Sequence, residues 1–423
     1  MTSSRRHLSF AILGLCGSPL IAWAQPVTTE VPSSTQPSTL RPVVVTATRT
    51  EAEPLDVPAS IDRVDGNELR LGRAQINISE SLSGVPGLAA RDRQNYAQDV
   101  QVSVRGFGAR STFGIRGVRL YVDGIPATLP DGQGQLSHVD LASVDHIEVL
   151  RGPFSALYGN SSGGVIQVFT EEGHGAPRLK LSVEGGSYGL LRYGAVASGN
   201  SGANDSGVGY VVSVNQFSTN GWRDHSETRR GLFNAKLTTR PSDDDKLTLV
   251  ANRVDMPQAQ DPLGLSRAQL SANPRGVDPA ASTFDTRKSM DQTQIGMVYE
   301  HRVDAANRLR ATFYGGQRST TQFQAIPIAV QANPLHPGGV IDLARNYGGT
   351  DLRWTWRNNL GGAPLTVVGG LAYDGLWEDR HGYENFVAST TGVAGKLRRD
   401  ERNTGTTSTS ICKPSGVPLT AGR

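Results

Sequence analysis

The sequence predicts an α+β N-terminal domain followed by antiparallel β-strands that cross an outer membrane. Glycine makes up 49 of the 423 residues, above its usual share of about 7%, which is typical of chains with many turns. No stretch beyond the first 24 residues approaches the roughly 18 uninterrupted apolar residues of a membrane-spanning helix. From about residue 177 onward, segments of roughly ten residues alternate apolar and polar side chains, as transmembrane β-strands do.

The charge balance argues against a nucleic-acid partner. The chain has 42 Lys and Arg against 39 Asp and Glu, a formal net charge of +3. Arg5 and Arg6 are the charged residues of the first 24, so 40 basic and 39 acidic residues follow them. Nucleic-acid-binding domains carry a clear basic excess instead. The two cysteines also exclude a disulfide scaffold.

Residues 1–24 are predicted to be a signal peptide. A basic start, MTSSRRH, precedes the apolar run LSFAILGLCGSPLIA, and a small-residue cleavage site ends at Ala24. A buried N-terminal helix is the alternative. A lipoprotein signal is not expected, because the residue before Cys16 is Leu15 rather than a small residue. The chain is therefore expected to be exported.

Residues 25–54 are predicted to be a flexible leader, because their first part is rich in Pro, Ser and Thr and poor in side chains that pack. The leader contains a run of residues with high β-strand propensity, formed by Val43, Val44, Val45, Thr46 and Ala47. This run is either the first strand of the next domain or a detachable strand that pairs with the sheet of a partner protein.

Residues 55–175 are predicted to form one α+β domain. Asp123-Gly124 supplies the turn of a β-hairpin, because both residues tolerate positive φ angles. The expected elements are a helix at 76–85, strands at 101–105, 118–122, 144–150 and 164–170, and a helical turn at 153–158.

Three short motifs in this domain resemble catalytic or cofactor motifs, but no enzyme activity, cofactor or metal is expected. G-x-S-x-G at 159–163 follows a helical turn and precedes a strand, the reverse of a nucleophile elbow. The pair Gly106 and Gly108 lacks the third glycine of a dinucleotide motif. His138 and Asp140 are too few for a metal site, and a solvated or capping role is expected. Backbone geometry is expected to explain Gly106, Gly108, Gly124 and Gly152.

Beyond residue 177 the alternation predicts nine strands. Leu352 and Trp354, for example, alternate with Asp351 and Arg353. The predicted strands are 178–185, 189–198, 208–218, 229–240, 246–255, 289–302, 307–322, 347–359 and 364–377. Links after even-numbered strands are short and most others are long, as in outer-membrane barrels with short periplasmic turns. The strands of a soluble β-sandwich also alternate apolar and polar residues. A β-sandwich does not, however, predict that short and long links follow each other in turn.

At this point the chain resembles the TonB-dependent outer-membrane receptors. The resemblance rests on residues 43–47 as a TonB box and on two plug-domain segments. These are VRGFGARSTFGIRGVRLYVDGIPATLPDGQGQ at 104–135 and VDHIEVLRGPFSALYGNSSGGVIQVFT at 144–170. The parts FGARSTFGIRG and PDGQGQ are most similar to a subgroup of receptors for ferric chelates and for pyrroloquinoline quinone.

The resemblance implies a plug at 55–175 inside a 22-stranded barrel, of which residues 177–403 supply about nine strands. Residues 404–423 are expected to be a frameshifted or aberrant tail, with a natural short isoform as the alternative. Unpaired backbone groups in hydrocarbon cost several kcal/mol each. The chain is therefore expected to be a truncated form that does not transport by itself.

The implied function is energised uptake of a scarce ligand across the outer membrane, through TonB and its inner-membrane complex. A ferric siderophore or similar iron chelate is the expected ligand, with pyrroloquinoline quinone or another anionic cofactor as the alternative. A passive porin or adhesin is the alternative from another class, and a secreted hydrolase is a third. The candidate ligand contacts are Arg91, Arg93, Arg110 and Arg116, because guanidinium groups bind carboxylates through two hydrogen bonds. Salt bridges between plug and barrel are the competing role for these arginines.

Overall fold

The computed structural model describes residues 60–93, 95–111, 113–152, 158–159 and 161–416. These residues belong to a compact unit that comprises Val43–Arg423. They form a five-stranded sheet in the N-terminal domain and a ten-stranded sheet, here called the wall. The predicted signal peptide and TonB box lie outside the described residues.

The N-terminal domain is built around the five-stranded sheet, whose order is β1-β6-β7-β4-β5. Its strands are β1 (Ser60–Asp65), β4 (Val118–Val122), β5 (Ile125–Pro126), β6 (Val144–Arg151) and β7 (Gly164–Thr170). The strands β4 and β7 run parallel, and the other neighbours are antiparallel. Leu120, Ile147 and Ile166 are fully buried in its core. This core forms from side chains of the domain itself.

Two short helices and a hairpin complete the domain: α1 (Gly66–Arg70), α2 (Ser79–Leu82), β2 (Leu88–Arg91) and β3 (Gln101–Val104). The predicted helix at 76–85 is present as α2 but is shorter. The predicted hairpin at Asp123-Gly124 is confirmed, with φ angles of 50° and 81°, the positive values that a type I′ turn needs. The strands β1 and β2 and the helix α1 were not predicted.

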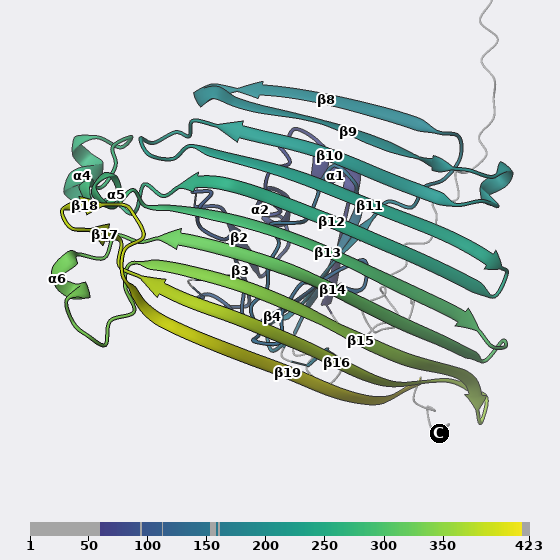
Figure 1. Ribbon diagram of the computed structural model, residues 1–423. Helices are drawn as coiled ribbons and strands as arrows, with labels where there is room; N and C mark the ends of the chain where they lie inside the picture. Colours follow the sequence, from purple (N-terminus) through teal and green to yellow (C-terminus); the bar gives the residue numbers. More distant parts are fainter. Residues whose placement is uncertain (1–59, 94, 112, 153–157, 160, 417–423) are drawn as a thin grey trace, which may run out of the picture. The chain divides into compact units, whose positions relative to one another are not determined.

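The wall consists of ten antiparallel strands, each paired with its neighbour in the chain (Figure 1). They are β8 (Arg178–Gly186), β9 (Leu190–Asn200), β10 (Gly209–Thr219), β11 (Thr228–Ser242), β12 (Asp245–Gln260), β13 (Arg287–Arg302), β14 (Asn307–Phe323), β15 (Val340–Leu360), β16 (Ala363–Tyr383) and β19 (Leu397–Gly416). The strands β8 and β19 are its edges, so the sheet of the described residues is not closed. The prediction of an α+β domain followed by an incomplete antiparallel barrel is confirmed.

The prediction of nine strands is wrong by one, because β19 was missed. This strand includes residues 404–416, which were expected to be an aberrant tail, and pairs with β16 from Tyr383 opposite Leu397 to Leu365 opposite Gly416. The segment is rich in threonine, which has high β-propensity. The segment lacks alternating apolar residues, the pattern that predicted the other strands, whereas its pairing with β16 needs only backbone hydrogen bonds.

The lengths of the links follow the predicted parity in part. Links 243–244, 303–306 and 361–362 are short, whereas 261–286, 324–339 and 384–396 are long. Links 201–208 and 220–227 are equal in length, and the first link, 187–189, is short. The long links carry α4 (Arg267–Ala272), α5 (Pro279–Phe284), α6 (Ile328–Gln331), β17 (Phe386–Val387) and β18 (Thr390–Thr391). These elements gather at one end of the wall in Figure 1. The two ends are called the long-link end and the short-link end below.

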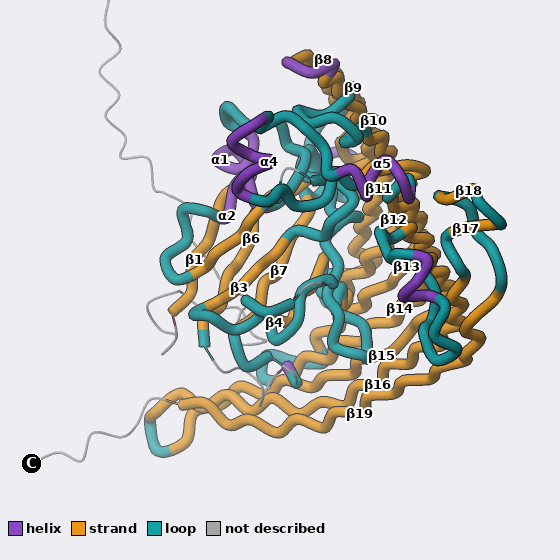
Figure 2. Tube along the Cα trace, turned by 90° about the vertical axis from the view of Figure 1, so that its left-hand side faces the viewer, coloured by secondary structure: helices purple, strands orange, loops and turns teal. Residues whose placement is uncertain are grey.

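The two faces of the wall differ in polarity. Leu181, Val183 and Leu371 on the outer face are 71%, 77% and 65% exposed. The inner face carries buried polar side chains that contact the N-terminal domain, which lies beside the wall in Figure 2. Among the described residues, no helix is long and apolar enough to cross a membrane.

Candidate functional site: the contact between the N-terminal domain and the wall

Charged side chains on the inner face of the wall hold the N-terminal domain. The alternation of each strand explains their position, because residues two apart lie on the same face of a sheet. Lys236, Lys288, Arg318 and Arg345 extend inward from β11, β13, β14 and β15. The first three are 6%, 7% and 3% exposed. A buried charge is tolerated only where it is paired and hydrogen-bonded.

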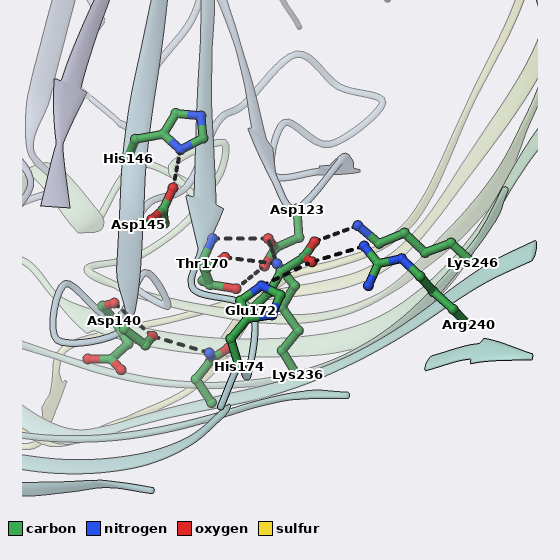
Figure 3. Close-up of polar contacts among 12 residues, drawn as sticks. Asp123, Asp140, Asp145, His146, Thr170, Glu172, His174, Lys236, Arg240 and Lys246 are labelled. Atoms are coloured by element: carbon green, nitrogen blue, oxygen red, sulfur yellow. Dashed lines mark hydrogen bonds and ion pairs between the residues drawn. The ribbon is translucent and has the colours of Figure 1, made fainter. Parts of the chain in front are cut away.

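Lys236 makes the most buried of these ion pairs, at the short-link half of the wall (Figure 3). Its Nζ lies 2.8 Å from Asp123 Oδ1 and donates to the backbone oxygen of Thr170 at 2.8 Å. Asp123 also accepts the backbone N–H of Thr170 at 3.0 Å and its hydroxyl at 2.6 Å. The hairpin turn at Asp123 and the end of β7 are therefore fixed to β11 by one ammonium group.

Glu172, just after β7, makes a second contact at the same end (Figure 3). Its carboxylate lies 2.5 Å from Lys246 Nζ and 3.7 Å from Arg240 Nη2. Burial raises the pKa of Glu172, but Lys246, Lys236 and Arg240 together lower it by more, so the net shift of the pKa is downward. Glu172 is therefore ionised at neutral pH, and its contact with Lys246 is a charge-assisted hydrogen bond.

Asp140 is a third contact and joins the domain to β10. Its carboxylate accepts hydrogen bonds from the Ser213 hydroxyl, from Asn215 Nδ2 at 2.9 Å and from the backbone N–H of Ala142 at 3.1 Å. Asp140 therefore caps a turn of its own segment. The predicted solvated role is wrong for both residues, because Asp140 and His138 are only 4% and 3% exposed. The ring of His138 is buried beside a small cavity that Leu129 of the same domain and Gln292 and Arg318 of the wall also line.

At the long-link end, Asp99 and Asp261 connect the two parts. Lys288 Nζ lies 2.9 Å from Asp99 Oδ1. Burial raises the pKa of Asp99, but Lys288 and Arg318 outweigh that effect, and the net shift is downward. Asp261, which follows β12, accepts from Asn95 Nδ2 at 2.6 Å and from Gln98 Nε2 at 2.5 Å.

Arginines on β14 and β15 contact the segment 131–137. Arg318 donates to Gln135 Oε1 at 3.1 Å and to Ser137 Oγ at 3.1 Å. Arg345 donates to Gln133 Oε1 at 2.8 Å. In one ion pair the N-terminal domain supplies the cation and the wall supplies the carboxylate. Arg119 of β4 lies 3.3 Å from Asp374 of β16. The PDGQGQ segment that marks the resemblance therefore lies against the wall.

Apolar contacts also join the two parts. One cluster joins Ala97 to Val254, Met256, Ala259 and Met290 of the wall, another joins Leu129 to Tyr347 and Leu376, and a third joins Ala142 to Val196 and Val211. The contact therefore combines these clusters with ion pairs and polar groups, which water can solvate when the two parts separate.

The four predicted ligand-contact arginines lie on the N-terminal domain. Arg91 ends β2, where it pairs with Gln101, and Arg93 follows it. Arg110 and Arg116 lie in the loop after β3, and all four are exposed. Arg116 lies 3.8 Å from Asp131. Among the described residues, none of the four forms an ion pair with the wall. Gly114 in the same loop donates its N–H to Asp99, which Lys288 holds at the long-link end.

The other sequence expectations concern glycines and metals. Gly106, Gly108, Gly124 and Gly152 all have positive φ, between 81° and 135°, so backbone geometry does explain them. Within the described part of the chain, no group of three or more His, Cys, Asp or Glu side chains is arranged to hold a metal ion. The wall cations that hold the domain were not predicted. Each of these cations stands out in the sequence as a single charged residue on the inner face of a strand. Its acidic or polar partner lies far away in the sequence, and no pattern there marks it as the partner.

Comparisons with known proteins agree with this architecture. Residues 53–165 match the family described as TonB-dependent Receptor Plug Domain. The vitamin B12 transporter BtuB of Photobacterium profundum is 33% identical over 172 residues, which is 40% of this chain and 27% of that protein. The hemin receptor of Yersinia pestis is 33% identical over 168 residues, 39% of this chain and 23% of that protein.

A solved structure extends the likeness to the wall. The unliganded ferric citrate transporter FecA superposes with a TM-score of 0.68 at 21% identity and covers 85% of this chain and 54% of that one. The chain thus spans about a quarter of the length of these curated relatives and about half of that structure. Such proteins are transporters or receptors rather than enzymes, as expected from the sequence. Residues 53–165 therefore belong to the family of TonB-dependent receptor plug domains, and the ten strands of an open wall follow them.

Proposed function

We propose that this chain serves the energised uptake of a scarce ligand across the outer membrane of a Gram-negative bacterium, and that the ligand is a ferric siderophore or a similar iron chelate. The observation that carries the proposal is the plug held on the polar inner face of the wall. A passive porin or an adhesin needs no such domain. The hemin receptor and the ferric citrate transporter support an iron-containing ligand.

In this proposal the leader couples the plug to its source of energy. Residues 43–47 pair as an extra strand with the periplasmic protein TonB, so that backbone hydrogen bonds supply the affinity. A pull on the leader reaches the plug at β1, the first strand of its sheet, which pairs with β6 over its whole length. The ion pairs of Asp123 and Glu172 with the wall would then have to break before the plug can move.

Ligand recognition is proposed for the exposed arginines of the plug. Arg110 and Arg116 belong to the segment FGARSTFGIRG, and they have their guanidinium groups at the surface. Charged hydrogen bonds of this kind contribute about 1.5–3 kcal/mol each. We expect the double variant Arg110→Gln, Arg116→Gln to bind an anionic iron chelate at least about tenfold more weakly. Arg229→Gln, on an exposed position of β11, serves as the matched control.

Growth of an iron-limited strain tests the proposal. The strain should lack its own siderophore receptors and express the complete gene product that contains this chain. Supplied ferric siderophores, ferric citrate, hemin and pyrroloquinoline quinone are compared one at a time, with and without a functional TonB. The proposal expects TonB-dependent growth on at least one iron chelate. Uptake of pyrroloquinoline quinone alone would favour the other subgroup, and TonB-independent entry of all compounds would indicate a passive pore.

A further inference from the structure

A cavity of about 440 Å³ lies between the plug and the short-link end of the wall. Its volume is within the range of small-molecule sites. The plug lines one side with three aromatic rings, those of Tyr121, Tyr158 and Phe169. The wall lines the other side with side chains from the ends of β11 to β15.

Five arginines from three adjacent strands dominate the wall side of this cavity: Arg302, Arg308, Arg310, Arg353 and Arg357. The strand register places Arg302 directly opposite Arg308 and Arg310 directly opposite Arg353. Like charges that face each other across two strands are destabilising unless something neutralises them. Carboxylates of the chain or a bound anion must therefore neutralise this charge.

Carboxylates of the chain compensate most of this charge, because Asp243, Asp244, Asp245 and Glu300 line the cavity as well. Asp244 lies 2.6 Å from Arg302, Glu300 lies 3.2 Å from Arg310, and Asp351 lies 2.6 Å from Arg353. Lys246 and Arg240, which also line the cavity, share Glu172 of the plug.

Arg308 and Arg357 keep their charges uncompensated, because neither forms an ion pair with a described residue. Arg308 faces Thr355 across the strands, and Arg357 lies two residues further along β15 on the same face. Their Cα atoms are thus diagonal neighbours, at roughly 7–8 Å. Two guanidinium forks at this spacing suit an anion that carries more than one carboxylate or phosphate group.

The plug closes the cavity beside the turn that contacts Lys236. The guanidinium of Arg310 lies against this turn, where a Cβ atom on Gly124 would come within 2.4 Å of it. The neighbouring residue Asp123 holds Lys236 at 2.8 Å. The cavity is therefore bounded by the same part of the plug that the wall holds at its short-link end.

We propose that this cavity is an anion-binding site for a small ligand with two or more carboxylate or phosphate groups, with Arg308 and Arg357 as its main contacts. The short-link end is the periplasmic side of a wall of this kind. The site would thus receive an anionic ligand after it has passed the plug. This transport role rests on the proposed uptake function, whereas anion binding by the cavity does not.

Calorimetric titration of the full chain, refolded in detergent, with citrate and with inorganic phosphate tests the proposal. Sodium chloride of equal ionic strength is the reference. We expect citrate to bind, and we expect the double variant Arg308→Gln, Arg357→Gln to bind it at least about tenfold more weakly. The double lysine variant, which retains the charges, should lose less. Arg178→Gln, which replaces an exposed arginine at the start of β8, should leave citrate binding intact.

The glutamine variants should fold, because neither replaced arginine leaves a carboxylate without its partner. A melting temperature within a few degrees of that of the unsubstituted chain checks this. Citrate binding that is equal in the double glutamine variant, or no stronger than the effect of chloride, overturns the proposal.

Uptake separates the two hypotheses. If no iron chelate is taken up but citrate still binds at the cavity, the uptake function fails and the anion site stands. If citrate binding is lost while uptake of the chelate stays at its normal rate, the transport role of the cavity is overturned.

Discussion

Replacement of Lys236 by methionine should loosen the plug where the structure holds it most tightly. The ammonium group lies 2.8 Å from Asp123 Oδ1 and 2.8 Å from the backbone oxygen of Thr170, and the side chains of the ion pair are only 7% and 3% exposed. Removal of one partner of a buried ion pair costs about 3–5 kcal/mol. Asp123 keeps two hydrogen bonds from Thr170, so we expect the lower end, about 3 kcal/mol.

A loss of about 3 kcal/mol raises the opening equilibrium constant of the plug roughly 100-fold. Hydrogen exchange measured by mass spectrometry on β4 and β7 reports this opening directly. The double variant Asp123→Asn, Lys236→Met should open less than Lys236→Met alone, because no buried carboxylate is then left without its cation.

Arg229→Met is the matched control. Arg229 pairs with Glu227 at 3.2 Å, but the two side chains are 65% and 38% exposed. Exposed pairs contribute less than about 1 kcal/mol, so exchange in β4 and β7 should change by less than about fivefold. If Lys236→Met changes this exchange no more than Arg229→Met does, the reasoning about the contact is refuted.

Two further predictions concern the plug. Burial, assisted by Arg318, lowers the pKa of His138 to about 3. The unfolded chain binds this proton near pH 6.5, so stability falls as the pH drops below that value, by about 2 kcal/mol at pH 5. In denaturant titrations, the free energy of unfolding of the His138→Asn variant should fall less between pH 7.5 and pH 5 than that of the unsubstituted chain. An equal fall in both would contradict the assignment of this pH dependence to His138. Gly108→Ala should lower the melting temperature more than Gly72→Ala does. Both have positive φ, but a Cβ on Gly108 lies 2.7 Å from Val102 O, whereas Gly72 has open space. Equal effects of the two would show that the close approach is not important.

Local signals in the sequence predicted most of the elements. The hairpin at Asp123-Gly124 and the strands β6 and β7 were predicted because turn chemistry and β-branched runs act over a few residues. The apolar alternation likewise predicted β8 to β16. β19 was missed because it is an edge strand rich in threonine, stabilised by its pairing with β16 rather than by an apolar face.

The contact between plug and wall could not be predicted from the sequence in the same way. Lys236 and Asp123 are 113 residues apart, and Lys288 and Asp99 are 189 apart. In the sequence, each of these residues looks the same as an ordinary charged residue at the protein surface. Only the register of the strands and the position of the plug bring the partners together, and both depend on the whole fold.

A proline at the proposed TonB box tests whether uptake depends on strand pairing with TonB. Val44→Pro removes a backbone N–H donor from the strand that is proposed to pair with TonB, and Val44→Thr, which keeps the donor, is the control. We expect cells with Val44→Pro in the complete gene product to bind the iron chelate normally but not to take it up, whereas Val44→Thr supports both. Normal uptake by the proline variant would contradict the proposed coupling to TonB.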